Sequence, residues 1–238
     1  MIRRPRWNNN QTPPVTLVVL LALTTLYLLS SSVFDQSAAS LWQRFFDGSS
    51  VAVLAELGAN AKVLTLEQNE WWRLLTATLL HGSIVHLLMN GFSLWNLGSQ
   101  LELGFGWQEL LFAFLVTGLS GSGMGAFFGN PLAISIGASG AIFGLLGFMI
   151  SVGTHDFNGL QRQLSKNGSM VAVALFLPML IPNVDHWAHI GGVASGLVLG
   201  FLYRNPPQAI RNLLGFSSAA LLVAGAGMIV FQALKIGF

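Results

Sequence analysis

The chain has 238 residues, of which 53% are hydrophobic and only 8% are charged, and its mean hydropathy is +0.64. Because an average soluble domain carries roughly 25% charged residues, this composition predicts a polytopic membrane protein of the all-α class. The chain contains no Cys, which excludes a disulfide framework, a thiolate metal site and a Cys nucleophile. The net charge of +2 is small, and no basic stripe interleaved with aromatic residues points to nucleic acid as a partner.

Seven apolar segments reach or approach the roughly 20 residues that a helix needs to span a bilayer. They cover residues 15–33, 74–99, 108–129, 136–153, 169–183, 187–203 and 212–234. The first segment follows RRPR, as a signal peptide would. It runs past a usual signal-peptide core, however, and SSSVF is a poor cleavage site, so we interpret it as a retained span.

The basic residues are distributed unevenly between the loops that these spans would leave. With seven spans, one side of the membrane receives seven of the 11 basic residues: Arg3, Arg4, Arg6, Arg162, Lys166, Arg204 and Arg211. Because short cytoplasmic loops carry the excess of Lys and Arg, this distribution predicts a cytoplasmic N-terminus. We expect an integral protein of a bacterial inner membrane.

The long loop at 34–73 contains no strong span. Its pieces SLWQRFFDG and VAVLAELGA are amphipathic, so we expect the loop to lie partly in the outer interface. It ends with Trp71, Trp72 and Arg73, where an aromatic belt with a snorkelling cation is expected.

Polar residues inside the second span form the first candidate site. His86 and Asn90 are four residues apart and therefore share one face of a helix. His81 would lie nearer the outer end and about 140° around the same helix. The pair is either a hydrogen-bonding contact to neighbouring helices or part of a functional site.

The fourth span begins near a serine surrounded by small residues. Pro131 and Gly137 indicate that the chain enters the membrane region in extended form, so that Ser139 begins a helix and faces a cavity. Taken alone, the motif favours Ser139 as a packing residue in a stripe of small residues. That stripe contains Gly140, Gly144 and Gly147.

The sixth span carries a matching stripe. His189 precedes Gly192, Gly196 and Gly200, whereas we interpret His186 as an exposed loop residue. Two helices lined by Gly can pack closely enough to bring Ser139 against His189. Ser needs a base to become nucleophilic, and His can accept its proton near neutral pH. No intramembrane Asp or Glu is identified as a partner for His189, which favours a dyad over a triad.

Four motifs in this order resemble those of the rhomboid intramembrane serine proteases over about residues 15–203. They are WWR at 71–73, H-x4-H-x3-N at 81, 86 and 90, GASG at 137–140 with Gly144, and AHIGG at 188–192 with Gly196. The resemblance implies a cytoplasmic tail at 1–14, a six-helix catalytic core at 15–203, and a linker with an extra transmembrane helix at 204–238.

The same resemblance implies a role for each site residue. Ser139 would be the nucleophile and His189 the general base, with His86, Asn90 and the backbone N–H of Ser139 forming the oxyanion hole. Gly137 would shape the loop around the nucleophile. Phe143 stands where the family often has Tyr, so the ring that stacks on the catalytic His would be kept and its hydroxyl lost.

The implied substrates are single-span transmembrane proteins, which would unwind near the outer face and enter from the bilayer beside spans two and five. Span five and the loop IPNVDH at 181–186, with Pro178 and Pro182, would form the gate. No cofactor and no metal are implied. Two other classes remain open: an inactive rhomboid-like protein that binds membrane helices, and a transporter or channel. The clustering of polar residues in the outer half disfavours a transporter.

Overall fold

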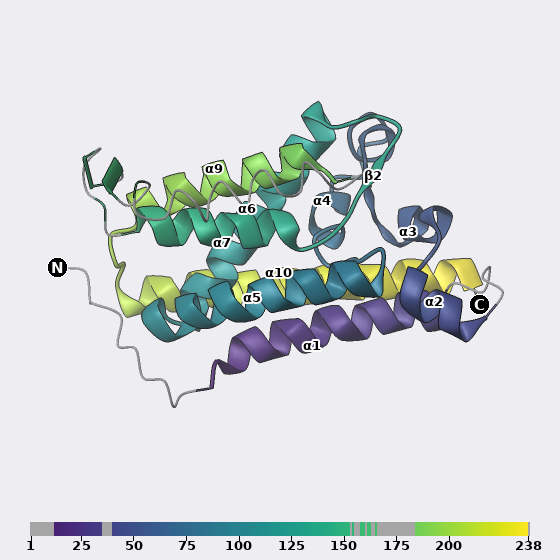
Figure 1. Cartoon of the computed structure of the whole chain (residues 1–238), viewed down its shortest axis with the longest axis horizontal. Coiled ribbons are helices and arrows are strands. Elements are labelled where there is room, and N and C mark those ends of the chain that lie inside the picture. The colour runs from purple at the N-terminus through teal and green to yellow at the C-terminus, as the bar shows by residue number, and fades with distance from the viewer. Residues whose placement is uncertain are drawn as a thin grey trace.

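The computed structural model describes residues 12–34, 40–152, 154, 158, 159, 161, 162, 165 and 184–237. Among these residues, three helices are long and apolar enough to span a membrane: Pro14–Ser31, Trp107–Phe128 and Gln208–Lys235. Two shorter apolar helices cover Ser139–Ser151 and His186–Leu202. Most of the longer helices run roughly along the long axis of the molecule, and Trp107–Phe128, labelled α6 in Figure 1, crosses behind them, so the chain is the all-α polytopic membrane protein that its composition predicts.

The elements follow the chain in this order: α1 (Pro14–Leu28), the π-helix η1 (Leu29–Phe34), α2 (Leu41–Asp47), α3 (Val51–Leu57), β1 (Asn60–Ala61), the π-helix η2 (Val63–Glu67), α4 (Arg73–Thr76), α5 (Ile84–Phe105), α6 (Trp107–Phe128), β2 (Ile134–Ser135), α7 (Ser139–Ser151), α9 (His186–Leu202) and α10 (Gln208–Gly237). Six of the seven expected spans correspond to α1, α5, α6, α7, α9 and α10. The expected fifth span at 169–183 lies outside the described residues.

The predicted start of the second span is wrong by ten residues. The helix begins at Ile84 and not at residue 74, because the hydroxyl of Ser83 accepts a hydrogen bond from the N–H of His86 at 3.2 Å and caps the helix there. The preceding segment forms only the short α4 and a turn. His81 therefore lies in the turn before α5, not on the helix.

The closest packing joins α7 to α9, which lie side by side in Figure 1. A Cβ added at Gly192 would lie 2.0 Å from the carbonyl oxygen of Gly140, and one at Gly196 would lie 2.0 Å from that of Gly144. Since no side chain fits at these distances, the predicted matching of the two glycine stripes is confirmed. This packing places the first turn of α7 against the first turn of α9.

Arg73 corrects the prediction of a snorkelling cation. Its side chain is buried, and its Nε donates to Oε2 of Glu70 at 2.6 Å. Its Nη1 donates to the carbonyl oxygens of Ala55 and Ala59 near the end of α3. The guanidinium is rich enough in donors to fix several carbonyl groups at once, so Arg73 ties α3 to α4, while the neighbouring Trp71 remains exposed.

A buried carboxylate that the sequence survey missed fixes the start of α1. Glu102, near the end of α5, accepts hydrogen bonds from the backbone N–H groups of Val15 and Thr16 at 2.9 and 2.7 Å. It also accepts one from the Thr16 hydroxyl at 2.7 Å. The first N–H groups of a helix have no partner within the helix, so Glu102 acts as a cap supplied by a distant segment.

The C-terminal helix α10 packs along α6 and against α3 and α4. Ile229 and Ala233 on its inner face are fully buried. A Cβ at Gly225 would lie 2.9 Å from Cγ of Leu75, whereas a Cβ at Gly227 would meet nothing within 4 Å. The two glycines therefore mark the packed and the open face of one helix.

Replacing Gly225 by Leu is expected to destabilise the protein by about 1–3 kcal/mol, because overpacking at Leu75 forces α10 away from α4. The measurement is the melting temperature of the detergent-solubilised chain. Gly227→Leu is the matched control and is expected to leave the melting temperature unchanged. Equal melting temperatures for the two variants would show that α10 does not pack on α4.

Candidate active site

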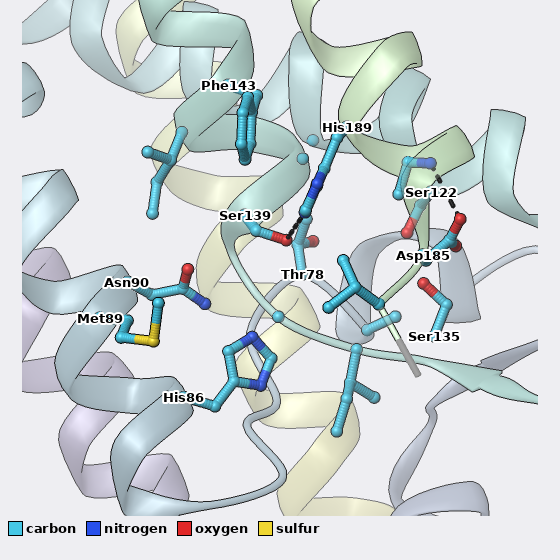
Figure 2. Close-up of a pocket in the computed structure, with 18 of the residues that line it drawn as sticks. Thr78, His86, Met89, Asn90, Ser122, Ser135, Ser139, Phe143, Asp185 and His189 are labelled. Carbon is cyan, nitrogen blue, oxygen red and sulfur yellow. Dashed lines mark hydrogen bonds between the residues drawn. The ribbon is translucent and has the colours of Figure 1, made fainter. Parts of the chain in front are cut away.

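A cavity of about 530 Å³ lies between α5, α7 and the first turn of α9 (Figure 2). It contains all of the residues that the sequence selects for the site: His86, Asn90, Gly137, Ser139, Phe143 and His189. These residues come from three helices and from the strand-like segment before α7. The fold thus gathers on one cavity side chains that lie up to about a hundred residues apart in the chain.

Ser139 and His189 are in direct contact. Ser139 is the first residue of α7, and its Oγ lies 2.9 Å from Nε2 of His189, as the dashed line in Figure 2 marks. His189 is buried in the first turn of α9. That turn is fixed by Asp185, whose carboxylate accepts a hydrogen bond from the N–H of Ala188 at 3.0 Å. A hydroxyl and an imidazole at this distance can exchange a proton.

The backbone before Ser139 is extended, as predicted, and it is held on both sides. The strand β2 pairs antiparallel with β1, with Ser135 opposite Asn60. Gly137 has a φ of +116°, and its N–H donates to the carbonyl oxygen of Ala77 at 2.8 Å. A Cβ at Gly137 would lie 2.6 Å from Nε2 of His86. Both the backbone conformation and the lack of space therefore require glycine at this position.

His86 and Asn90 lie on the face of α5 that lines the cavity, on the other side of the 135–138 segment from α9 (Figure 2). Asn90 is buried, and its Nδ2 lies 3.0 Å from Nε2 of His81. Because an amide nitrogen can only donate, one Asn90 proton goes to His81 and the second is left for the cavity. His86 stands close by, with its ring centroid 5.1 Å from that of His81.

His81 is a site residue whose place the sequence analysis did not find. It is fully buried and restrains the amide of Asn90 through the contact of its Nε2 with Asn90 Nδ2. The signal that could have located it is the Ser at 83, three residues before His86, since a Ser in that position is typical of a helix start. A helix that begins after Ser83 frees His81 to turn back towards Asn90.

The ring of Phe143 stacks on the imidazole of His189, with centroids 4.2 Å apart and an interplanar angle of 23°. Figure 2 shows both side chains at the cavity wall, with Phe143 on α7 and His189 on α9. Such stacking fixes the plane of the imidazole without a hydrogen bond. His186 is not an exposed loop residue, as predicted, but the partly buried first residue of α9.

The second ring nitrogen of His189 distinguishes the pair from a triad. Nδ1 of His189 is buried and has no hydrogen-bond partner among the described residues. Asp185 also lines the cavity, but its carboxylate caps α9. The part of the chain that the structure describes therefore presents a serine and a histidine without a carboxylate on Nδ1.

Comparisons with known proteins agree with this architecture. The family model described as the Rhomboid domain matches residues 68–206, more than half of the chain. "RHOMBOID-like protein 6, mitochondrial" of Arabidopsis thaliana is 39% identical over 166 residues, which cover 69% of this chain and 54% of that protein. "Rhomboid protease GluP" of Bacillus subtilis is 31% identical over 179 residues, which cover 75% of this chain and 35% of that protein.

A third relative, "Rhomboid-type serine protease 2" of Emericella nidulans, is 27% identical over 162 residues, 67% of this chain and 32% of that protein. The chain spans about half the length of the Arabidopsis relatives that it matches.

The fold and its apolar helices define an integral membrane protein of all-helical architecture. The chain belongs to the rhomboid family.

Proposed function

We propose that the chain is an intramembrane serine endopeptidase in which Ser139 is the nucleophile and His189 the general base. The observation that carries this proposal is the 2.9 Å contact between Ser139 Oγ and His189 Nε2 inside a cavity at the start of two closely packed helices. Relatives whose names describe them as rhomboid proteases support it.

In the proposed first step, Ser139 Oγ attacks the carbonyl carbon of the scissile peptide bond while Nε2 of His189 takes the hydroxyl proton. The carbonyl oxygen becomes an oxyanion. We assign its stabilisation to the N–H of Ser139, the second amide proton of Asn90 and the ring of His86. The lack of a side chain at Gly137 lets the backbone before Ser139 lie close to His86, so that the donors can point at one oxyanion. His81 holds the Asn90 amide in its orientation.

In the next step the C–N bond breaks, and the proton on Nε2 passes to the leaving amine. A water molecule then attacks the acyl-enzyme while His189 takes one of its protons. Collapse of the second intermediate returns that proton to Ser139 and releases the product carboxylate. His189 carries the proton in every step, so the reaction needs only Ser139 and His189. Phe143 stacking keeps the imidazole in one plane throughout.

We also propose single-span transmembrane proteins as substrates, which would reach the cavity from the bilayer. Arg204 follows the end of α9 and Arg211 lies in the first turn of α10, whereas Ser139 contacts the first turn of α9, so the two arginines are at the opposite end of α9 from Ser139. With the N-terminus in the cytoplasm of a bacterium, cleavage would occur towards the outer face of the plasma membrane. The predicted gate at 169–186 lies largely outside the described residues, although Val184 and Asp185 line the cavity.

The competing function is that of an inactive rhomboid-like protein that binds membrane helices. The intact Ser139–His189 contact favours the protease. The test is cleavage of a model transmembrane substrate by the purified chain, compared with Ser139→Ala. The wild type is expected to cleave the substrate, and Ser139→Ala to bind it without cleavage.

Ser120→Ala is the matched control, because Ser120 lies on α6 and its hydroxyl donates only to its own helix at Val116. This variant is expected to cleave at the wild-type rate. Equal cleavage by the wild type and Ser139→Ala would rule out the serine mechanism, and binding without cleavage by the wild type would favour the inactive relative.

A further inference from the structure

A second cavity lies at the end of the molecule away from Ser139. It has a volume of about 250 Å³ and lies where α6, α9 and α10 meet, beside the linker at 203–207 that joins α9 to α10. Its residues take no part in the proposed peptidase chemistry.

The ion pair between Arg211 and Glu109 forms one wall of the cavity. Arg211 on α10 donates from Nε to Oε1 of Glu109 at 2.5 Å and from Nη2 to Oε2 at 2.8 Å. The hydroxyl of Tyr203 donates to the same carboxylate at 3.0 Å. The Glu109 carboxylate is buried, and both of its oxygens accept hydrogen bonds. The Arg211–Glu109 ion pair therefore fixes the shape of the cavity and leaves no unpaired negative charge in it.

The mouth of the cavity carries an uncompensated cation. Arg204 is exposed, and the acceptors that the structure gives it are the backbone oxygens of Phe201 and Tyr203, at 2.5 and 3.2 Å. Among the described residues, no carboxylate pairs with it. With Glu109 neutralised by Arg211, the cavity retains one net positive charge, and Arg204 keeps N–H donors free for an anion.

Apart from Gln108, whose amide donates to Asn212 of α10, the rest of the lining is apolar. It includes Phe112, Phe148, Leu199 and Leu214, from α6, α7, α9 and α10. Leu202 beside them is also exposed on the outer surface of α9. An apolar wall under a single cation, at the end of a membrane helix, matches the two halves of a phospholipid and not a soluble anion.

We propose that this cavity binds one anionic glycerophospholipid, with its phosphodiester on Arg204 and an acyl chain along the apolar wall. Basic pockets between transmembrane helices on the cytoplasmic side commonly take such headgroups, and that is the side on which the basic residues place this cavity. The bound lipid would bridge α6, α9 and α10, so it would fasten the C-terminal helix to the core. This proposal does not rest on the proposed peptidase activity.

The test is lipid retention by the full chain, purified in a neutral detergent and studied by native mass spectrometry and thermal melting. Phosphatidylglycerol and phosphatidylcholine with identical acyl chains are added in parallel, with inorganic phosphate as a third arm. One phosphatidylglycerol per chain is expected to be retained and to raise the melting temperature. Phosphatidylcholine and inorganic phosphate are expected to do neither.

Two variants and a control locate the site. Arg204→Gln is expected to weaken phosphatidylglycerol binding about fivefold, the effect of one cation near a membrane surface. Leu199→Trp, which fills the cavity, is expected to abolish retention. Lys235→Gln removes a cation at the other end of α10 and is expected to change nothing.

Equal retention of the two lipids, the same stabilisation by inorganic phosphate, or equal losses in Arg204→Gln and Lys235→Gln would each overturn the proposal. The readouts need no catalysis, so the Ser139→Ala protein serves equally well. Failure of the lipid site and failure of the peptidase are therefore separate results.

Discussion

Replacing His189 by Ala is expected to lower kcat on a transmembrane substrate by about four orders of magnitude or more. The reason is the position of the imidazole, whose Nε2 is 2.9 Å from Ser139 Oγ. Without it, no described side chain contacts the hydroxyl to accept its proton, and the leaving amine loses its proton donor. Nδ1 of His189 has no hydrogen-bond partner among the described residues, so replacing His189 leaves no described carboxylate without its partner.

The measurement is a single-turnover cleavage assay in reconstituted vesicles, with the melting temperature as a check on folding. His186→Ala is the matched control, since it removes the same side chain from the same helix one turn earlier. It is expected to keep most of the wild-type rate. Similar rates for wild type and His189→Ala would mean that another group is the base.

Replacing Asn90 by Ala is expected to lower kcat by about 10²–10³-fold with little change in KM, the usual cost of one oxyanion-hole donor. Asn90 has one amide proton on His81 and the other free towards the cavity. The donor is held before the substrate arrives by the fully buried His81. Its benefit is therefore felt mainly in the transition state, when charge develops on the carbonyl oxygen.

The same vesicle assay separates kcat from KM for this variant. Asn96→Ala is the control, because Asn96 lies on the exposed face of α5 and its amide donates to Phe92 of its own helix. It is expected to behave as the wild type. A rise in KM with unchanged kcat for Asn90→Ala would assign Asn90 to substrate binding and not to the oxyanion hole.

The apolar spans could be predicted because their signal is local. A run of apolar residues long enough to cross a bilayer has few alternatives to a helix, since every backbone group must be bonded within the segment. The small-residue stripes of α7 and α9 were predictable for a related reason: glycines repeated every three or four residues leave a flat helix face, and such faces pack against each other. The contact between Ser139 and His189 follows from that packing.

The parts that escaped prediction depend on partners far away in the chain. Glu102 is an ordinary charged residue near the end of a span until α1 brings the N–H groups of Val15 and Thr16 to it. Arg73 resembles an interfacial cation until the carbonyl oxygens of Ala55 in α3 and of Ala59 just after it accept its hydrogen bonds. Burial of a charge is decided by whether distant groups can satisfy it, and spacing along the sequence does not contain that information.

His81 combines a local and a distant cause. The local cause is the Ser83 cap, which ends the turn and starts α5 after His81. The distant cause is the contact of His81 with Asn90, which lies nine residues later in the chain and about one and a half turns into α5. Apolar residues on both sides of the HGS at 81–83 hid the helix start, so the hydrophobic pattern alone placed His81 on the wrong element.

The central claim is that Ser139 is made nucleophilic by His189 within the membrane, and one measurement addresses it directly. The purified chain is treated with a fluorophosphonate, and the modified residue is located by peptide mass spectrometry. The adduct is expected on Ser139 in the wild type and absent from His189→Ala, while His186→Ala is labelled normally. Labelling of Ser139 that is as fast in His189→Ala as in the wild type, or no adduct on Ser139 in a folded wild-type chain, would contradict the account.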